Sequence, residues 1–354
     1  MQDNNINTVQ ENPSLLRDRI IPVTVILVLI LVIVFFMFQD QILGFLGLRQ
    51  APEASFDLKG SVYLTMRPLA NNDYNDQVSS YLFNAETSEL EEFLNPDDNF
   101  TGPVKLSPDN DKLAFISEDD EHMMQVFVKD LSSGSVDQIT RGIILAKQVT
   151  DWSPDGSQVA FVGITVLDSL GDLEQSLFYP EAWDIYVADL EGNIRFITKG
   201  SSPFFSPDGK YLLCLKNSGF HLVDIETGQS VQAMPDRDGT AGRSMKLDLS
   251  NDRTMLALSN ADGNALFVYK IGSWKPFSFE SGKNVHTRGF WPVFSPDNRY
   301  LAFEEVDMVD AGEGEHEFVN PRLVFYDLES FEKQKAIDLN QYSQTSMWIS
   351  DWGN

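Results

Sequence analysis

Three arginines lie in connecting segments between repeated apolar strands and could bind a carboxylate group together. They are Arg141, Arg243 and Arg288. Guanidinium groups hold carboxylates through paired hydrogen bonds, so a cluster of arginines is a typical receptor for an acidic substrate. The side chains close to them in sequence that could share such a site are Asp151, Asp248 and Trp291.

A segment at residues 164–183 mixes large apolar side chains with aspartate and glutamate. One interpretation is a partner-docking element with exposed aromatic anchors, since aromatic residues dominate the energetics of protein interfaces. The other is a short amphipathic helix that covers its own part of the core. Both interpretations stay open. The candidate anchors are Leu173, Leu177, Phe178, Tyr179 and Trp183.

Metal and thiol chemistry have weak support in the sequence. The acidic run at 304–317 contains Asp307, Asp310 and Glu313 as candidate calcium ligands, but it lacks the regular spacing of a calcium loop. A solvated charge run is the competing interpretation, and no cofactor is predicted. The single cysteine, Cys214, sits in the apolar run YLLCL and is expected to be a buried thiol.

A repeat organises the chain. Five segments share the pattern of an apolar residue, a serine-led turn and a second apolar run, with the serines 44 to 53 residues apart. Serine first, proline second and glycine fourth are type I turn preferences, so each segment predicts a hairpin between two strands. The segments are LSPDNDKLAF, WSPDGSQVAF, FSPDGKYLLC, LSNDRTMLAL and FSPDNRYLAF.

A second repeat follows each hairpin and gives two more strands per unit, as in VFVKDLSSG and IYVADLEGN. The first unit lacks its first strand, whereas the C-terminal MWISDWGN provides a first strand with nothing after it. The sequence therefore predicts an all-β, six-bladed β-propeller whose C-terminal strand closes the first blade, which removes an exposed sheet edge.

These segments resemble the WD-like propeller repeat of the TolB family, over residues 57–354. The resemblance implies a six-bladed module of bacterial envelope proteins. It does not extend to the role of TolB, which has an additional α/β domain before its propeller. In such propellers the serine-led hairpins share one face, and the long loops share the other. Because long loops on a rigid ring usually carry binding, we expect the binding surface on the loop face.

Residues 20–38 form an apolar run without a charged residue, long enough to cross a bilayer as a helix of about 28 Å. A cleaved signal peptide fits less well because its apolar stretch would be shorter. Arg17 and Arg19 precede the run and the next basic residue is Arg49, which predicts the N-terminus inside. The expected organisation is a cytoplasmic tail at 1–19, a transmembrane helix at 20–38, a linker at 39–56 and the propeller at 57–354.

Charge narrows the classes of function. The formal net charge of −27 opposes binding to nucleic acid. The leading hypothesis is a membrane-anchored scaffold or subunit of an envelope complex, periplasmic or extracellular, that binds protein partners. It is predicted not to be an enzyme, because the chain lacks a G-x-S-x-G elbow, a phosphate loop and a metal-ligand pattern. The alternative is a sialidase-like glycoside hydrolase that uses the three arginines at the channel mouth.

Overall fold

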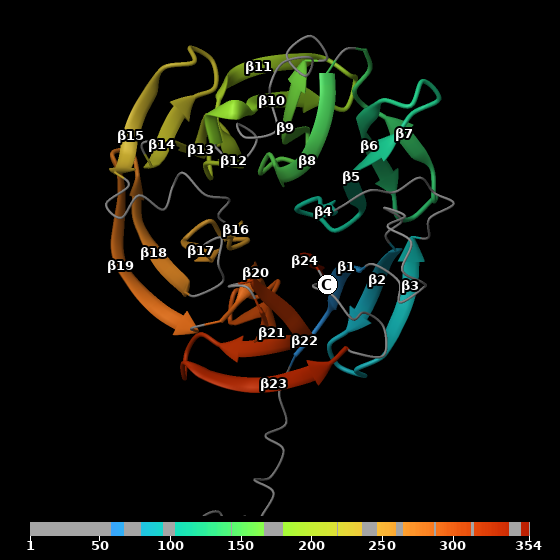
Figure 1. The fold of residues 1–354 in the computed structure, drawn as a ribbon. Helices are drawn as coiled ribbons and strands as arrows, with labels where there is room; N and C mark the ends of the chain where they lie inside the picture. The colour runs from blue at the N-terminus through green and yellow to red at the C-terminus, as the bar shows by residue number, and fades with distance from the viewer. Residues whose placement is uncertain are drawn as a thin grey trace, which may run out of the picture. The chain divides into compact units, whose positions relative to one another are not determined.

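The structure, a computed structural model, describes residues 58–66, 79–94, 103–142, 144–165, 180–217, 219–235, 246–259, 265–286, 288–312, 315–339 and 348–353. They form six four-stranded antiparallel sheets arranged as blades around a central axis (Figure 1). In each blade the first strand below lies innermost.

Blade 1 contains β24 (Trp348–Gly353), β1 (Ser61–Met66), β2 (Ser79–Asn84) and β3 (Leu90–Leu94). Blade 2 contains β4 (Lys105–Leu106), β5 (Lys112–Glu118), β6 (Met124–Asp130) and β7 (Val136–Gln138). Blade 3 contains β8 (Ile144–Trp152), β9 (Gln158–Thr165), β10 (Asp184–Asp189) and β11 (Ile194–Lys199), with the 3-10 turn η4 (Pro180–Ala182) before β10.

Blade 4 contains β12 (Ser201–Phe205), β13 (Tyr211–Lys216), β14 (Gly219–Asp224) and β15 (Ser230–Pro235). Blade 5 contains β16 (Lys246–Leu249), β17 (Met255–Ser259), β18 (Leu266–Trp274) and β19 (Phe277–His286). Blade 6 contains β20 (Phe290–Phe294), β21 (Tyr300–Gly312), β22 (Glu315–Asp327) and β23 (Glu332–Asp338).

The core lies between neighbouring blades. The second strands are apolar on both faces, as in β5, where Leu113 to Ile116 are all buried, because each blade packs against a neighbour on either side. One such layer joins Ile116 and Val126 of blade 2 to Trp152 and Phe161 of blade 3. Sheet-on-sheet burial repeated around the ring therefore holds the blades together.

The serine-led segments form the hairpins that the sequence predicts. In each one the serine hydroxyl donates to the aspartate two residues later at 2.6–2.7 Å and accepts the backbone N–H five residues later at 2.8–3.0 Å. The fourth turn residue is left-handed, which suits Gly156 (φ 69°) and also holds Arg253 (φ 58°). The hairpins are rigid, locally bonded corners.

The C-terminal strand closes the ring as predicted. Strand β24 pairs with β1 from Trp348↔Thr65 to Gly353↔Ser61. The Trp352 indole, 2% exposed, donates to the Lys59 carbonyl at 2.8 Å. The first and last described segments thus meet in one blade, which leaves no unpaired inner edge there.

The acidic run at 304–317 lies mostly within the long β21–β22 hairpin, which the sequence analysis did not predict. In this hairpin Asp307 pairs in register with Val319 and is bound by Arg322. The described residues contain no helix long and apolar enough to cross a membrane. The predicted helix at 20–38, with its flanking segments at 1–19 and 39–56, lies outside them.

Candidate binding site in the central channel

One register position of the inner strands faces the channel. It lies two residues before the first residue of each hairpin. The residues at this position, from blade 1 to blade 6, are Asp351, Lys105, Asp151, Phe204, Asp248 and Val293. Blades 1, 3 and 5 thus carry aspartate, and the other three blades carry other residues.

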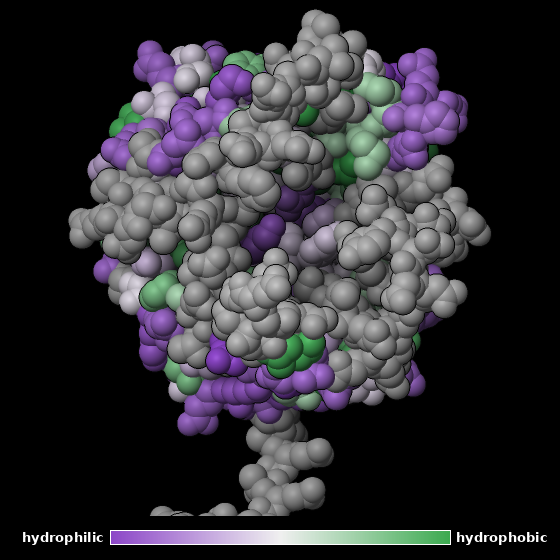
Figure 2. Space-filling view, in the orientation of Figure 1, coloured by the Kyte–Doolittle hydropathy of each residue, from purple (hydrophilic) through white to green (hydrophobic). Residues whose placement is uncertain are grey.

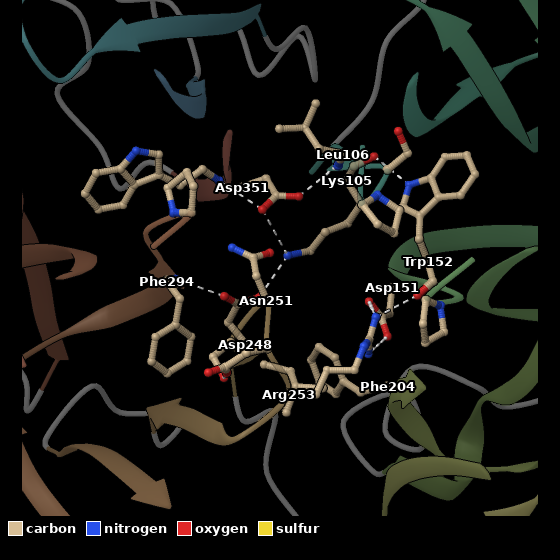
Figure 3. Close-up of a pocket in the computed structure, with 18 of the residues that line it drawn as sticks. Lys105, Leu106, Asp151, Trp152, Phe204, Asp248, Asn251, Arg253, Phe294 and Asp351 are labelled. Atoms are coloured by element: carbon tan, nitrogen blue, oxygen red, sulfur yellow. Dashed lines mark hydrogen bonds and ion pairs between the residues drawn. The ribbon is translucent and has the colours of Figure 1, made fainter. Parts of the chain in front are cut away.

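A hollow of about 290 Å³ lies at the hairpin end of the channel. Hairpin prolines line it, among them Pro108, Pro154 and Pro207. The side chains of Lys105, Asp248 and Asp351 point toward one another inside it (Figure 3). The hollow of about 290 Å³ opens among the hairpins, whereas the sequence analysis expected binding on the loop face. The space-filling view looks onto the opposite face, where the middle of the molecule is also hollowed and the described atoms seen there are hydrophilic (Figure 2).

Each channel aspartate ties its blade to the next one. Asp351 accepts the N–H of Leu106 at 2.8 Å, Asp151 that of Phe205 at 2.7 Å and Asp248 that of Phe294 at 2.9 Å. In each case the acceptor is a carboxylate, and the donor is the backbone N–H of the residue that precedes the next blade's hairpin. Charge-assisted bonds of this type are stronger than neutral ones, so they stabilise three of the six blade junctions.

Arg253 fills the junction between blades 3 and 4. Its guanidinium donates to both oxygens of Asp151 at 2.7 and 3.2 Å, to the Trp152 carbonyl at 2.9 Å and to the Phe205 carbonyl at 2.7 Å. The Arg253 and Asp151 side chains are 11% and 17% exposed. We call the carboxylate and its two flanking carbonyls a guanidinium clamp, and Arg253 satisfies it from blade 5.

Lys105 crosses the channel from blade 2 to blade 5 (Figure 3). Its ammonium donates to Asp248 at 2.9 Å and lies 3.8 Å from Asp351. Burial opposes the charge of Lys105, but the two carboxylates together raise its pKa above the usual value. Burial raises the pKa of Asp248 to about 6, against the lowering influence of Lys105. At neutral pH both groups are therefore charged.

A second, smaller hollow of about 50 Å³ lies at the other end of the channel. Lys105 and Phe204 border both hollows. At the second hollow the backbone of Trp291 is left-handed, with φ 51°. Its ring meets the Trp348 ring edge-on, with 6.2 Å between the ring centroids. The Lys246 ammonium lies 3.9 Å from the centroid of the Trp291 ring. Trp291, predicted from sequence as a binding residue, thus lies at the loop end of the channel.

The other predicted site residues are scattered or outside the described residues. Arg141 is exposed and donates to Gln138 at 2.8 Å, and Arg288 is exposed near Asp307. Trp183 is 9% exposed and packs in the core between blades 3 and 4. Outside the described residues lie Leu173, Leu177, Phe178, Tyr179, Arg243 and Glu313. Both the docking segment and the arginine cluster of the glycoside hydrolase alternative therefore remain predictions.

The calcium candidates are partly engaged elsewhere. Asp307 is held by Arg322 at 2.8 Å and by Asn320 at 3.1 Å, and these bonds lower its pKa. Within the part of the chain that the structure describes, no group of three metal-ligating side chains is found. Cys214 is fully buried, as expected, and burial raises its pKa to about 12.

Sequence reasoning missed Lys105, Arg253 and Asp351 as site residues, and named Asp151 and Asp248 merely as neighbours of the arginines. The repeat itself contains a signal for the aspartates. When the repeats are aligned, the position two residues before each hairpin is acidic in three alternate blades. This alternation marks the position that faces the channel. Arg253 was harder to find, because it replaces a turn glycine and acts two blades away.

No protein-family model matches the chain. TolB from Acinetobacter baumannii superposes with a TM-score of 0.59 at 16% identity, over 84% of this chain and 68% of that one. A putative TolB from Agrobacterium tumefaciens gives 0.51 at 16% identity, over 84% and 94%. The chain has the fold of the TolB-type six-bladed β-propellers.

A curated relative corrects one prediction about this TolB-type propeller. The chain is 27% identical over 215 residues to a Bacillus subtilis protein named "Uncharacterized peptidase YuxL", a match that covers 56% of this chain and 28% of the relative. The prediction that the protein is not an enzyme is contradicted by this match. That prediction rested on missing sequence motifs, and a chain can share its propeller with a peptidase without displaying them.

Proposed function

We propose that this TolB-type propeller binds a protein partner in the cell envelope and that the partner docks at the hairpin-side hollow. The observation that carries the proposal is the pocket itself. The hollow of about 290 Å³ is lined by hairpin prolines and by charged side chains from several blades, among them Lys105, Asp151 and Asp248. Concave sites with a few convergent polar groups are the usual binding sites of proteins.

The chemistry of the hollow favours a polypeptide ligand. Its floor combines carboxylates with cations, and its rim is built from prolines and hairpin backbone. The strong negative charge of the chain opposes binding to phosphate backbones. TolB-like architecture supports an envelope location for such an interaction.

We further propose that the helix at residues 20–38 holds the propeller at the outer surface of the cytoplasmic membrane. The uncharged apolar run and the two preceding arginines support this topology. Extraction of membranes with alkaline carbonate should leave the full-length protein in the pellet, and protease added outside spheroplasts should degrade the propeller. Release by carbonate, or protection of the propeller, would contradict the topology.

Photo-crosslinking tests the docking site. A benzoylphenylalanine at Pro207, which is exposed on the rim of the hollow, should give a defined adduct with one envelope protein in cells. The matched control carries the same residue at Glu191, an exposed turn position that does not line the hollow. Absence of an adduct at Pro207, or equal adducts at both positions, would contradict the proposal.

A second candidate is a propeller that presents peptides for hydrolysis, which the match to the named peptidase favours. Under this proposal the purified full-length protein, by itself or with an envelope fraction, hydrolyses fluorogenic peptides. The rate should fall when the hollow is blocked by a bulky side chain at Pro207. Hydrolysis that is unchanged by the block would separate this activity from the hollow.

A further inference from the structure

The guanidinium clamp of the blade 3/4 junction has a counterpart at the blade 1/2 junction. At blade 3/4 it consists of the Asp151 carboxylate and the carbonyls of Trp152 and Phe205. The repeat register places the same groups at blade 1/2. They are the Asp351 carboxylate and the carbonyls of Trp352 and Leu106, three residues that all line the hollow.

The backbone bond that shapes the clamp is also present at both junctions. Asp351 accepts the Leu106 N–H at 2.8 Å, as Asp151 accepts the Phe205 N–H at 2.7 Å. Each carboxylate is thereby fixed against the next blade. At blade 1/2 the other carboxylate oxygen, Asp351 Oδ1, also accepts the Trp352 N–H at 2.9 Å, so the Asp351 carboxylate is held in place before a ligand arrives.

The group that fills the first clamp is missing from the second. Arg253 is the fourth turn residue of blade 5 and reaches back to blade 3/4. The equivalent residue for blade 1/2 is the fourth turn residue of blade 3, which is Gly156 and has no side chain. Among the described residues, Lys105 is within ion-pair distance of Asp351, at 3.8 Å, but it donates to Asp248.

We propose that the blade 1/2 clamp, formed by Asp351, Trp352 and Leu106, binds the guanidinium of an arginine from the protein partner. This inference rests on the proposed function, because it identifies the chemistry of the docking segment. The Asp351 side chain is 18% exposed, so a ligand in the hollow can reach it. The hollow is lined by four carboxylates and two cations, so its charge favours a cationic ligand.

The clamp selects arginine over lysine. Its acceptors are a carboxylate with a carbonyl on either side, and the planar guanidinium fork donates to all of them at once, as Arg253 does. A lysine ammonium is a compact point charge that cannot span the same set. The partner segment therefore carries an arginine that enters past the hairpin prolines.

A peptide titration of the full-length protein tests the proposal. The probe is Ac-Gly-Gly-Arg-Gly-Gly-NH2, with citrulline and lysine versions as neutral and cationic controls. The readout is the indole N–H resonance of Trp352, which should shift with the arginine peptide at least about tenfold more readily than with either control. The Trp152 indole should move less, because Arg253 already occupies its clamp.

Two variants locate the binding. Asp351→Asn keeps an acceptor for the Leu106 N–H but removes the charge, and should weaken arginine binding about tenfold or more. Gly156→Arg should fill the clamp from within and abolish the shift. Its Cβ has room, with Pro108 at 3.8 Å, and Arg253 shows that arginine adopts the same left-handed turn.

The control is Gly209→Arg. Its backbone is equally left-handed, and its Cβ would lie 3.7 Å from Pro154. The junction that it faces carries Lys105 at the position where blade 1/2 carries Asp351. This variant should leave peptide binding unchanged. Equal shifts with the arginine and citrulline peptides, or with the lysine peptide, would overturn the inference, as would unchanged binding in Gly156→Arg. If these results came with an intact adduct at Pro207, the docking function would stand and the arginine assignment would fall.

Discussion

The blade 3/4 and blade 1/2 junctions present the same set of acceptors and differ in what occupies them. At blade 3/4 the guanidinium of Arg253, a residue of the same chain, donates hydrogen bonds to the carboxylate and to both carbonyls. At blade 1/2 the corresponding turn residue is Gly156 and the clamp faces the hollow. The comparison teaches that one repeat position can be structural in one blade and available to a ligand in another.

The largest effect is expected at the filled junction. Arg253→Met leaves the Asp151 carboxylate largely buried without its cation, which should lower the free energy of unfolding by about 3 kcal/mol. Urea denaturation of the full-length protein measures this. Arg299→Met is the matched control, because Arg299 is 48% exposed and solvent screens its pair with Asp327, so a smaller loss is expected. Equal losses in the two variants would break the distinction between a clamp and a surface pair.

The cross-channel pair should show the next largest effect. Lys105→Met leaves Asp248 buried without its cation, and we expect a loss of about 2 kcal/mol. Adding Asp248→Asn to that variant should restore part of the loss, because the uncompensated charge is then removed. A double-mutant cycle measures the coupling. Additive losses would show that Lys105 and Asp248 act independently, contrary to the geometry.

The stability should also depend on pH. The pKa of Asp248 is raised to about 6 from its ordinary value of 3.8, so between these values the folded state binds this proton more tightly than the unfolded state does. The contribution of Asp248 to stability is therefore present below about pH 4 and is lost as the pH rises through 6. The difference between the wild type and Asp248→Asn isolates it. A carboxyl carbon titration that placed this pKa near 4 would contradict the account.

The fold could be predicted from the sequence because its signal is local and repeated. Serine-led turns and alternating strands specify each hairpin, and the unmatched strand at MWISDWGN specifies the closure. The long β21–β22 hairpin was not predicted, because its acidic composition suggested a loop while cross-strand pairs such as Asp307 with Arg322 stabilise strands.

The site could be predicted in part. The alternation of aspartates is visible once the repeats are aligned, but the partners of each aspartate come from other blades. Lys105 reaches across the ring to Asp248, and Arg253 reaches two blades back to Asp151. Such contacts depend on ring geometry, which no sequence spacing encodes. Of the three arginines of the sequence analysis, Arg141 and Arg288 do not line this hollow, and Arg243 lies outside the described residues.

The most direct test of the clamp comparison is the stability of the two turn variants. Gly156→Arg and Gly209→Arg carry the same strain at equivalent left-handed positions, but they differ in the junction that the new arginine meets. If blade 1/2 holds an unfilled clamp, the free energy of unfolding of Gly156→Arg should exceed that of Gly209→Arg by about 1 kcal/mol or more. Equal stability, or a less stable Gly156→Arg, would contradict the clamp at blade 1/2.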